Sequence, residues 1–440
     1  MKPSLSFSAL ALACVLALAA CSEAARLPES ALTGRQPTIA APERTLLPTV
    51  KIAPAVGWPS GAKPQAATGT QVVAFATDLV HPRWLLVLPN GDVLVAETNA
   101  PPRPESEQGV RAWVMKMVMK RAGAGVPSAN RITLLRDADG DGRAEVRSVF
   151  IQGLNSPFGM ALVGERLYVA NTDAIVSFPY QSGQIKVDAS PTVVTDLPAG
   201  PRNHHWTKNL IANADGTKLY VTVGSNSNVA ENGMAVEEGR AAIWEVDLPF
   251  GAKRLYASGL RNPNGLAWGA AGDGTLWTVV NERDELGSDL VPDYLTSVQR
   301  DAFYGWPYSY FGRNVDARVK TPRPDRVTQA LVPDYALGAH VAPLGLVRSD
   351  GGKLPAPFID GMFVGLHGSW NRRPPSGYKV VFVPFKQGRP DEQQPIDVLT
   401  GFLSPQGDAY GRPVGVAMDR SGSLLVADDV GNVVWRVAPQ

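Results

Sequence analysis

Cysteine is almost absent from this sequence of 440 residues, which contains only Cys14 and Cys21. Both lie near the N-terminus, so disulfide bonds and cysteine catalysis are excluded for the body of the protein. A charge imbalance is also missing. The net charge of +1 argues against a nucleic-acid partner. The remaining composition, with 44% hydrophobic and 19% charged residues, is that of a globular chain long enough to bury a core.

Motifs for the commonest cofactors and nucleophiles are missing as well. No G-x-G-x-x-G opens a strand–helix unit, and the chain has no P-loop, no G-x-S-x-G elbow and no H-E-x-x-H. These absences argue against NAD, ATP and serine-hydrolase functions. No apolar run after the N-terminus is long enough to predict a transmembrane helix.

The N-terminus has the pattern of an export signal. The apolar run Leu5–Leu18 is too short to span a bilayer and ends in Leu-Ala-Ala-Cys. This resembles a bacterial lipoprotein signal, which predicts removal of residues 1–20, lipidation of Cys21 and anchoring in the periplasm, with Ser22 favouring the outer membrane. A plain signal peptide cleaved nearby is the alternative. Residues 21–68 are rich in Pro and Ala and predict a flexible tether.

A repeated hairpin organises the rest of the chain. In Gly259–Glu285 a polar residue, proline and glycine open a short strand, a small-residue turn follows, and a second strand ends in polar residues. An antiparallel hairpin brings its two ends to one edge. We therefore expect Arg261 and Asn262 to lie near Asn281 and Glu282.

Six copies of this unit predict an all-β fold, a six-bladed β-propeller with helical and loop insertions over residues 69–440. Copies roughly 50 to 90 residues apart with Gly-containing turns are typical of blades. A pair of β-sandwiches is the alternative. The last strand, Val433–Val437, is expected to pair near Gln71–Thr77 and close the ring. The copies begin near His81, Ser156, His204, Gly259, Ala342 and Arg412.

Two rings of polar residues should meet at one mouth of this propeller. Four of the five histidines fall on these rings, although polar strand ends also serve simply to satisfy backbone groups. The first ring, at the strand entrances, comprises His81, Ser156, His204 or His205, Asn262, Ala342 and Arg412. The second ring, at the exits, comprises Glu97, Asn171, Ser225, Asn281 with Glu282, His367 and Asp428.

Two insertions carry further patterns. Val110–Ala122 has apolar residues at helical spacing with basic residues between them, which predicts a helix packed on the domain or, alternatively, one at a membrane surface or partner. In Asp137-Ala-Asp139-Gly-Asp141-Gly, alternating carboxylates suit a calcium loop that Glu145 could complete, but no bidentate Glu stands at the twelfth position. A structural calcium site and a plain acidic turn both remain open.

Individual residues at the mouth suggest chemistry. Because neighbours on a strand face opposite sides, His204 and His205 do not form a metal pair, and one positioned histidine would suit a general base or be held by backbone contacts. Arg372 with Trp370 suits a planar carboxylate. The acidic run from Glu282 to Asp289 could hold a divalent cation or be solvated.

Several motifs together resemble the soluble quinoprotein sugar dehydrogenases, most of all their sorbosone dehydrogenase-like branch. The resemblance rests on Gly259-Leu-Arg-Asn-Pro-Asn-Gly-Leu266, the stretch from His205 to Gly224, His367-Gly-Ser-Trp-Asn-Arg372, and Arg412 before the last hairpin. The resemblance covers roughly residues 70–440. It implies a six-bladed propeller that binds pyrroloquinoline quinone (PQQ) and Ca²⁺ at the top of its channel.

The resemblance also implies roles for matched residues. His205 matches the general base, Arg261 the residue that stabilises charge on the cofactor, and Asn262 a cofactor contact. Arg412 and, more loosely, Arg372 match basic residues that bind PQQ carboxylates. Asn155 or Ser156 falls near a polar cofactor contact.

Two departures from the family pattern concern the cofactors. Asp284 and Glu285 stand where a Gly-Pro pair offers carbonyl groups to calcium, and Val414 replaces a second arginine. The sequence thus predicts a PQQ- and calcium-dependent dehydrogenase of aldoses or sugar aldehydes that uses an external electron acceptor. A non-catalytic propeller that binds carbohydrate or protein is the alternative, and a metal-dependent lactonase ranks last because the mouth looks cationic.

Overall fold

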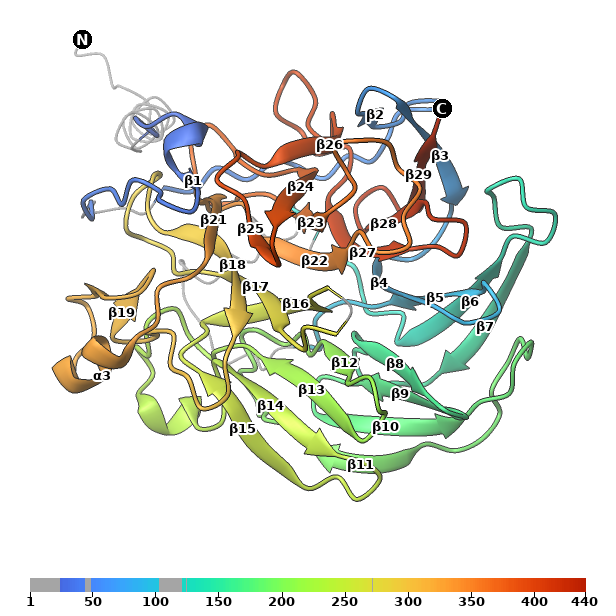
Figure 1. Cartoon of the computed structure of the whole chain (residues 1–440), viewed down its shortest axis with the longest axis horizontal. Coiled ribbons are helices and arrows are strands. Elements are labelled where there is room, and N and C mark those ends of the chain that lie inside the picture. The colour runs from blue at the N-terminus through green and yellow to red at the C-terminus, as the bar shows by residue number, and fades with distance from the viewer. Residues whose placement is uncertain (1–23, 44–48, 103–120, 124, 271) are drawn as a thin grey trace, which may run out of the picture.

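Six antiparallel sheets form a ring in the computed structural model, which describes residues 24–43, 49–102, 121–123, 125–270 and 272–440 (Figure 1). The fold is a six-bladed β-propeller, as the sequence predicts. Blade 1 consists of β4 (Pro82–Val87), β5 (Val93–Glu97), β6 (Arg131–Arg136) and β7 (Val146–Gln152). Blade 2 consists of β8 (Met160–Val163), β9 (Arg166–Ala170), β10 (Ala174–Pro179) and β11 (Thr192–Asp196). Blade 3 consists of β12 (Leu210–Ala212), β13 (Lys218–Val223), β14 (Ala242–Asp247) and β15 (Lys253–Ser258).

The other three blades each recruit a strand from the N-terminal part of the chain. Blade 4 consists of β16 (Asn262–Trp268), β17 (Leu276–Asn281), β18 (Pro292–Val298) and β21 (Tyr335–Ala339), with β1 (Thr33–Gly34) at its edge. Blade 5 consists of β22 (Pro343–Arg348), β23 (Gly361–Leu366), β24 (Lys379–Lys386) and β26 (Ile396–Thr400), with β2 (Gln65–Ala66) and β25 (Arg389–Pro390). Blade 6 consists of β27 (Pro413–Met418), β28 (Leu424–Asp428), β29 (Val433–Pro439) and β3 (Thr70–Ala76).

The first strands of the blades contact one another around the centre, in the order β4, β8, β12, β16, β22, β27 and back to β4. The glycine of the repeated opening makes this possible. A Cβ on Gly345 would lie 2.2 Å from the Val414 carbonyl oxygen, and one on Gly265 would lie 2.7 Å from the Leu346 nitrogen. Neighbouring backbones thus approach where a side chain would not fit. The glycine of the repeat motif is therefore required for packing between blades.

The ring closes where the last strand pairs with the third strand of the chain. Strand β29 pairs antiparallel with β3, from Val434 opposite Ala76 to Pro439 opposite Thr70 (Figure 1). This confirms the predicted pairing. Closure leaves the sixth sheet with four strands, like the sheets of blades 1, 2 and 3, although its strands come from distant parts of the sequence.

The stretch that the sequence predicts as a flexible tether lies along the propeller in the described residues 24–43 and 49–68. β1 pairs with β21, and β2 pairs with β26 (Figure 1). Between them, the Trp58 ring contacts Phe402 and Trp435 with centroids 5.4 and 5.5 Å apart. These contacts differ from those of a free tether. We call residues 49–58, which run beside the mouth loops of blades 5 and 6, the strap.

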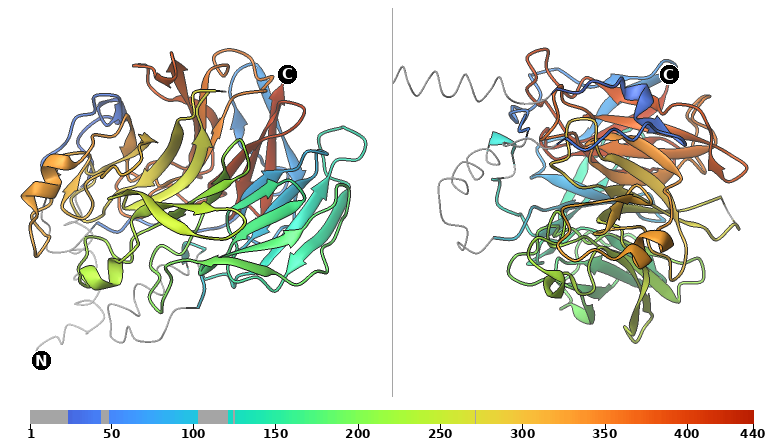
Figure 2. Two further views of the ribbon diagram at one scale, coloured as in Figure 1. Left: turned by 60° about the horizontal axis from the view of Figure 1, so that its bottom comes forward. Right: turned by 90° about the vertical axis from the view of Figure 1, so that its left-hand side faces the viewer.

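An excursion between β18 and β21 carries a short hairpin and a helix: β19 (Ser309–Tyr310), β20 (Asn314–Val315) and α3 (Pro324–Gln329). Figure 2 shows α3 at the periphery of the ring. Among the described residues no helix has the length and apolar character needed to cross a bilayer. The signal segment 1–20, Cys21 and most of the predicted helix Val110–Ala122 lie outside the described residues, so those predictions stand as they are.

Candidate functional site

The polar rings meet at one end of the propeller, as predicted. Pairing places Pro82 opposite Glu97 and Pro413 opposite Asp428, so the start of each first strand lies beside the end of the second. We call this end the mouth. The same pairing joins Asn262 to Asn281. All three residue pairs have the hairpin geometry expected from the repeat.

Two exit residues serve the structure of the blades. Glu97 is fully buried and accepts hydrogen bonds from Arg131 at 2.8 and 3.0 Å. Asp428 accepts hydrogen bonds from the backbone nitrogens of Arg412 and Gly431, each at 2.8 Å. For these two positions the simpler interpretation applies, since their carboxylates hold neighbouring strands and loops.

His205 is positioned by the end of β13. Its Nδ1 lies 2.8 Å from the carbonyl oxygen of Ser225 and 3.1 Å from the Ser225 hydroxyl. That hydroxyl donates to the Ser227 carbonyl at 2.7 Å, so both Ser225 oxygens act as acceptors toward the ring. Nδ1 therefore carries the proton, and Nε2 has a free lone pair. This is the tautomer that a general base at Nε2 requires.

Burial and neighbouring charge keep this imidazole neutral. Burial is the largest cause that holds the pKa of His205 well below its usual value, and His204 and Arg261 lower it further. The His204 and His205 rings meet edge to face with centroids 4.6 Å apart. At neutral pH His205 is thus available to accept a proton.

Asn262 lies directly beside His205. A Cβ on Gly224 would lie 2.4 Å from Asn262 Oδ1 and 2.6 Å from the His205 Cβ, so Gly224 leaves room for both side chains. Asn262 Oδ1 is buried without a hydrogen-bond partner among the described residues. A buried polar atom without a partner is unusual and indicates a group yet to bind.

Arg261 is 3% exposed and is held by the loops of blades 3 and 4. Its guanidinium donates to Asp284 Oδ2 at 3.0 Å, to Asn228 Oδ1 at 3.1 Å and to the carbonyl oxygens of Asn281 and Glu282. The last two contacts confirm the expected proximity of these hairpin ends. Arg261 is near enough to His205 to lower its pKa.

The two predicted calcium ligands at the mouth, Asp284 and Glu285, differ in exposure and in their contacts. Asp284 uses Oδ2 for Arg261 and Oδ1 for Asn371 Nδ2 at 2.7 Å. Glu285 is exposed. Both oxygens of the Asp284 carboxylate therefore already have protein donors, which makes this pair a poor fit to a cation that needs six or more oxygen ligands.

Arg372 is committed to the neighbouring loop. It donates to the Ser288 carbonyl at 2.9 Å and to Asp289 Oδ1 at 3.4 Å. Asp289 Oδ2 in turn accepts from the backbone nitrogen of Leu27 at 3.0 Å. These contacts tie the N-terminal part of the chain to blades 4 and 5, and they occupy the guanidinium expected to grip a carboxylate.

A second group of charged residues surrounds Asp429, and it combines His81 and His367 of the predicted rings with Arg83 and Asp429, which sequence reasoning missed. Its Oδ2 accepts from Arg83 Nη1 at 2.7 Å and lies 2.9 Å from His367 Nε2. His81 Nδ1 lies 3.0 Å from the Asp429 carbonyl oxygen. We call Arg83, His81, His367 and Asp429 the Asp429 cluster. It joins blades 1, 5 and 6 at the mouth.

The charges in this cluster are tightly coupled. Burial alone would raise the pKa of the Asp429 carboxyl, but His367, His81 and Arg83 together hold it far below its usual range. Burial lowers the pKa of His367 to about 4, against the opposing effect of Asp429. At neutral pH the carboxylate is therefore ionised and paired with Arg83, while His367 is neutral.

Arg412 lies next to this cluster and completes the cationic part of the mouth. Its guanidinium carbon lies 4.9 Å from the centre of the Tyr378 ring, and Nη2 donates to the Ala53 carbonyl of the strap at 3.4 Å. Arg412 and Arg83 both lower the pKa of His367. The Arg83 guanidinium also faces the Trp206 ring at 5.9 Å, which links the Asp429 cluster to the segment that carries His205.

The repeat explains how Arg83 could have been found. In blade 6 the residue after the opening proline is Val414, and in blade 1 it is Arg83. The two strands, β27 and β4, are neighbours in the ring. An arginine therefore stands in the adjacent blade at the repeat position where the resemblance expects one and finds Val414.

The mouth has the donors and acceptors that an oxygen-rich anion needs. Several buried polar atoms there have no hydrogen-bond partner in the described part of the chain, namely Arg83 Nε, Arg412 Nε, Asn262 Oδ1, Asn371 Oδ1 and Asp429 Oδ1. They come from blades 1, 4, 5 and 6. Two unsatisfied guanidinium donors suit carboxylates, whereas the two carboxamide oxygens and Asp429 Oδ1 are acceptors and suit a donor group on the bound molecule. The two guanidinium groups fit PQQ, which carries three carboxylates.

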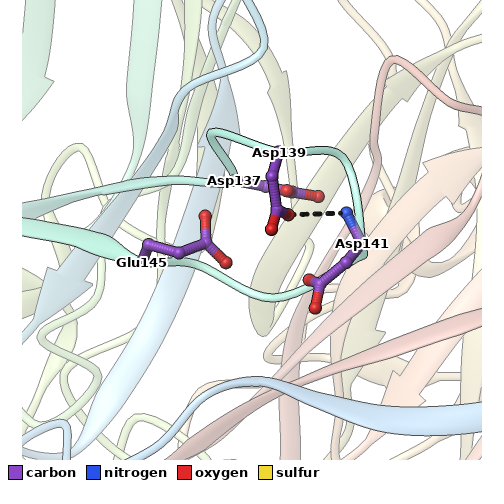
Figure 3. Close-up of side chains that lie close together, drawn as sticks. All are labelled: Asp137, Asp139, Asp141 and Glu145. Atoms are coloured by element: carbon purple, nitrogen blue, oxygen red, sulfur yellow. Dashed lines mark hydrogen bonds between the residues drawn. The ribbon is translucent and has the colours of Figure 1, made fainter.

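The acidic turn lies away from the mouth. It joins β6 to β7 at the opposite end from the start of β6, and Figure 3 shows its four carboxylates facing one another. One oxygen from each of Asp137, Asp139, Asp141 and Glu145 lies within 4.8 Å of the others. Asp137 also accepts from the backbone nitrogens of Gly140 and Gly142 at 2.7 and 2.9 Å. The turn therefore has internal partners whether or not a cation binds.

Asn155 is exposed and lies apart from both clusters, in a pocket of about 290 Å³ at the mouth side of blades 1, 2 and 3. Its Nδ2 donates to Asp173 Oδ2 at 2.9 Å. The structure thus brings together His205, Arg261, Asn262 and Asp284, sets Arg412 with the Asp429 cluster, and leaves Asn155 and the acidic turn elsewhere.

Fold and site together define a six-bladed propeller whose mouth contains several buried guanidinium groups and a neutral histidine. The sequence model of the TrAA12-like family matches residues 64–300 and 318–440, so the chain belongs to this family. The resemblance drawn from the motifs is confirmed at this level.

Named relatives are similar over much of the chain. A pyrroloquinoline quinone-dependent pyranose dehydrogenase of Coprinopsis cinerea is 26% identical over 331 residues, which is 62% of this chain and 44% of that protein. The holo PQQ domain of a Coprinopsis cinerea pyranose dehydrogenase superposes with a TM-score of 0.66, at 22% identity over 88% of this chain and 100% of that domain. The calcium structure of the Trichoderma reesei AA12 enzyme gives a TM-score of 0.68, at 20% identity over 89% and 99% of the two chains.

Proposed function

We propose that this protein is a PQQ-dependent oxidoreductase that acts on sugars. The observation that carries the proposal is the set of unpartnered guanidinium and carboxamide atoms at the mouth, beside a neutral histidine with a free Nε2. The family and the named relatives support the same reaction class. Aldoses and sorbosone-like sugar aldehydes are the substrates that we propose within this class, with an external electron acceptor.

The chain's own residues would perform the binding and the proton transfer. Arg83 and Arg412 would hold cofactor carboxylates through their unpartnered Nε groups, and Asn262 would contact the cofactor beside His205. Arg261 would stabilise negative charge nearby. When bound, PQQ supplies the acceptor for the hydride of the sugar carbon. His205 Nε2 would take the proton of the hydroxyl that is oxidised.

Calcium enters the proposal at two places. At the mouth, Asp284 and Glu285 would bind it only if the cation displaced Arg261 or Asn371 from the Asp284 carboxylate. In the turn, Asp137, Asp139 and Asp141 would bind it as a structural ion. Calorimetric calcium titration of Asp284→Asn and Asp139→Asn variants separates the two sites, because each substitution removes only its own binding event.

Substituting His205 tests the proposed chemistry. In protein reconstituted with PQQ and Ca²⁺, His205→Ala should lower dye reduction on a sugar panel by about 10²–10⁴-fold and leave PQQ binding largely intact. His204→Ala is the matched variant. It should keep turnover but move the acid limb of the pH profile upward, because His204 lowers the pKa of His205. Unchanged turnover in His205→Ala would remove His205 from this role.

We also propose that Cys21 is lipidated and anchors the protein to the outer membrane on its periplasmic side. The proposal rests on the Leu-Ala-Ala-Cys sequence. In a bacterial host, the wild-type protein should fractionate with membranes and Cys21→Ser should appear in the soluble fraction. Equal fractionation of both would reject lipid anchoring.

A further inference from the structure

A pocket separate from the two charged clusters lies at the mouth side of blades 1, 2 and 3. It has a volume of about 290 Å³ and is lined by polar residues and prolines, among them Pro101, Asn155, Thr172, Asp173, Arg202 and Asn203. We propose that this pocket binds a second sugar ring of the substrate, so that the enzyme prefers saccharides or glycosides of at least two rings. This inference rests on the proposed function.

The volume and chemistry of the pocket suit a sugar ring. About 290 Å³ is at the lower end of the usual range for small-molecule sites. Asp173 is exposed, and Asn155 supplies one of the roughly four hydrogen bonds that a carboxylate can accept. Hydroxyl groups both donate and accept, so a polyol can meet a carboxylate, a carboxamide and a guanidinium together, whereas an anion would be repelled by Asp173. The prolines offer flat apolar faces to the C–H side of a ring.

The floor of the pocket is continuous with the segment that carries His205. Thr172 Oγ1 donates to the Trp206 carbonyl at 2.9 Å and accepts from Asn203 Nδ2 at 2.7 Å. Asn203 Oδ1 accepts from Arg240 Nη2 at 3.1 Å, and Arg240 Nη1 donates to the Gly224 carbonyl at 3.3 Å. These bonds fix the pocket relative to His205.

Asn203, which lines the pocket, lies two residues before His205 in the sequence, so the proposal places the next ring of a substrate held at His205 in the pocket. Binding of a remote, non-reacting ring can be used to position the reacting one. Asn155 lines the same pocket and donates to Asp173, so it would contact the substrate ring in this proposal.

The test compares Asp173→Ala with Asp188→Ala. Asp188 is an exposed aspartate of the same blade, in the β10–β11 connection at the opposite end, and it serves as the matched control. Saturation-transfer NMR with glucose and cellobiose measures binding to PQQ-free protein. Dye reduction by the reconstituted enzyme gives the ratio of kcat/KM for cellobiose over glucose.

We expect cellobiose to bind the PQQ-free protein and the kcat/KM ratio to fall about tenfold in Asp173→Ala but not in Asp188→Ala, since a hydrogen bond to a charged group is lost. A ratio in Asp173→Ala equal to that of the wild type would overturn the inference. So would the absence of cellobiose binding to the PQQ-free protein. If cellobiose binds at Asp173 but PQQ is not taken up, the pocket stands and the proposed dehydrogenase function fails.

Discussion

Replacing His367 by a residue that does not titrate tests the electrostatics of the Asp429 cluster. The side chain of His367 is 19% exposed and its pKa is lowered to about 4, first by burial, from an unfolded value of 6.5. Because the folded-state pKa is the lower one, its contribution to stability is complete above pH 6.5 and is lost as the pH falls toward 4. The difference of about 2.5 pKa units corresponds to about 3 kcal/mol.

The variant His367→Gln keeps an N–H donor for Asp429 and removes the titration. Urea unfolding of the PQQ-free protein, followed by tryptophan fluorescence at pH 7, 6, 5 and 4, gives the free energy of unfolding of both proteins. Between pH 7 and 4 the wild type should lose about 3 kcal/mol more than His367→Gln. The other buried histidines titrate in both proteins and cancel. Parallel pH curves would refute the assignment of a neutral His367 held beside an ionised Asp429.

Three further predictions concern the strap, the cradle beside His205 and the acidic turn. Trp58→Ala removes ring contacts and the hydrogen bond to Asp428 Oδ2 at 2.7 Å, so calorimetric melting should show a loss of about 3 kcal/mol, and an unchanged melting temperature would contradict the described path of the strap. Gly224→Ala places a Cβ against Asn262 and should weaken PQQ binding at least about tenfold in a spectral titration, while wild-type affinity would show that Asn262 does not contact the cofactor. Asp139→Asn should leave dye reduction unchanged, because the turn lies at the far end of blade 1, and lost turnover would tie that turn to catalysis.

The fold was accessible from the sequence because its determinants are local and repeated. The hairpin with its small-residue turn recurs in each blade, the opening proline in five blades and the glycine in four, and Gly265 and Gly345 show why the glycine recurs. The closing pair, β29 with β3, followed from the need to remove free edges.

The N-terminal stretch was not accessible in the same way. Its Pro- and Ala-rich composition predicts a tether, but β1, β2 and Trp58 find partners more than 300 residues away in sequence. Nothing in a segment's own composition reports such partners. Tertiary pairing thus orders residues that local propensity leaves open.

The residues of the site also fall into those that local motifs predict and those whose partners are distant in sequence. His205, Arg261 and Asn262 belong to motifs within one or two blades, and the structure brings them together. Arg83 could be found only by comparing equivalent repeat positions. Its partner Asp429 lies 346 residues away in the sequence. Arg372 and Asp284 carry the right side chains for a ligand, but their partners, Asp289 and Arg261, come from other loops.

The most direct test of a cofactor-binding mouth is a spectral titration of the purified PQQ-free protein with PQQ. The expected result is a saturable absorbance change at one equivalent, which is lost in the double variant Arg83→Ala/Arg412→Ala. The double variant Arg323→Ala/Arg326→Ala, at and within helix α3 on the periphery, is the matched control and should titrate like the wild type. No absorbance change in the wild type, or an equal titration of the Arg83/Arg412 variant, would contradict the account.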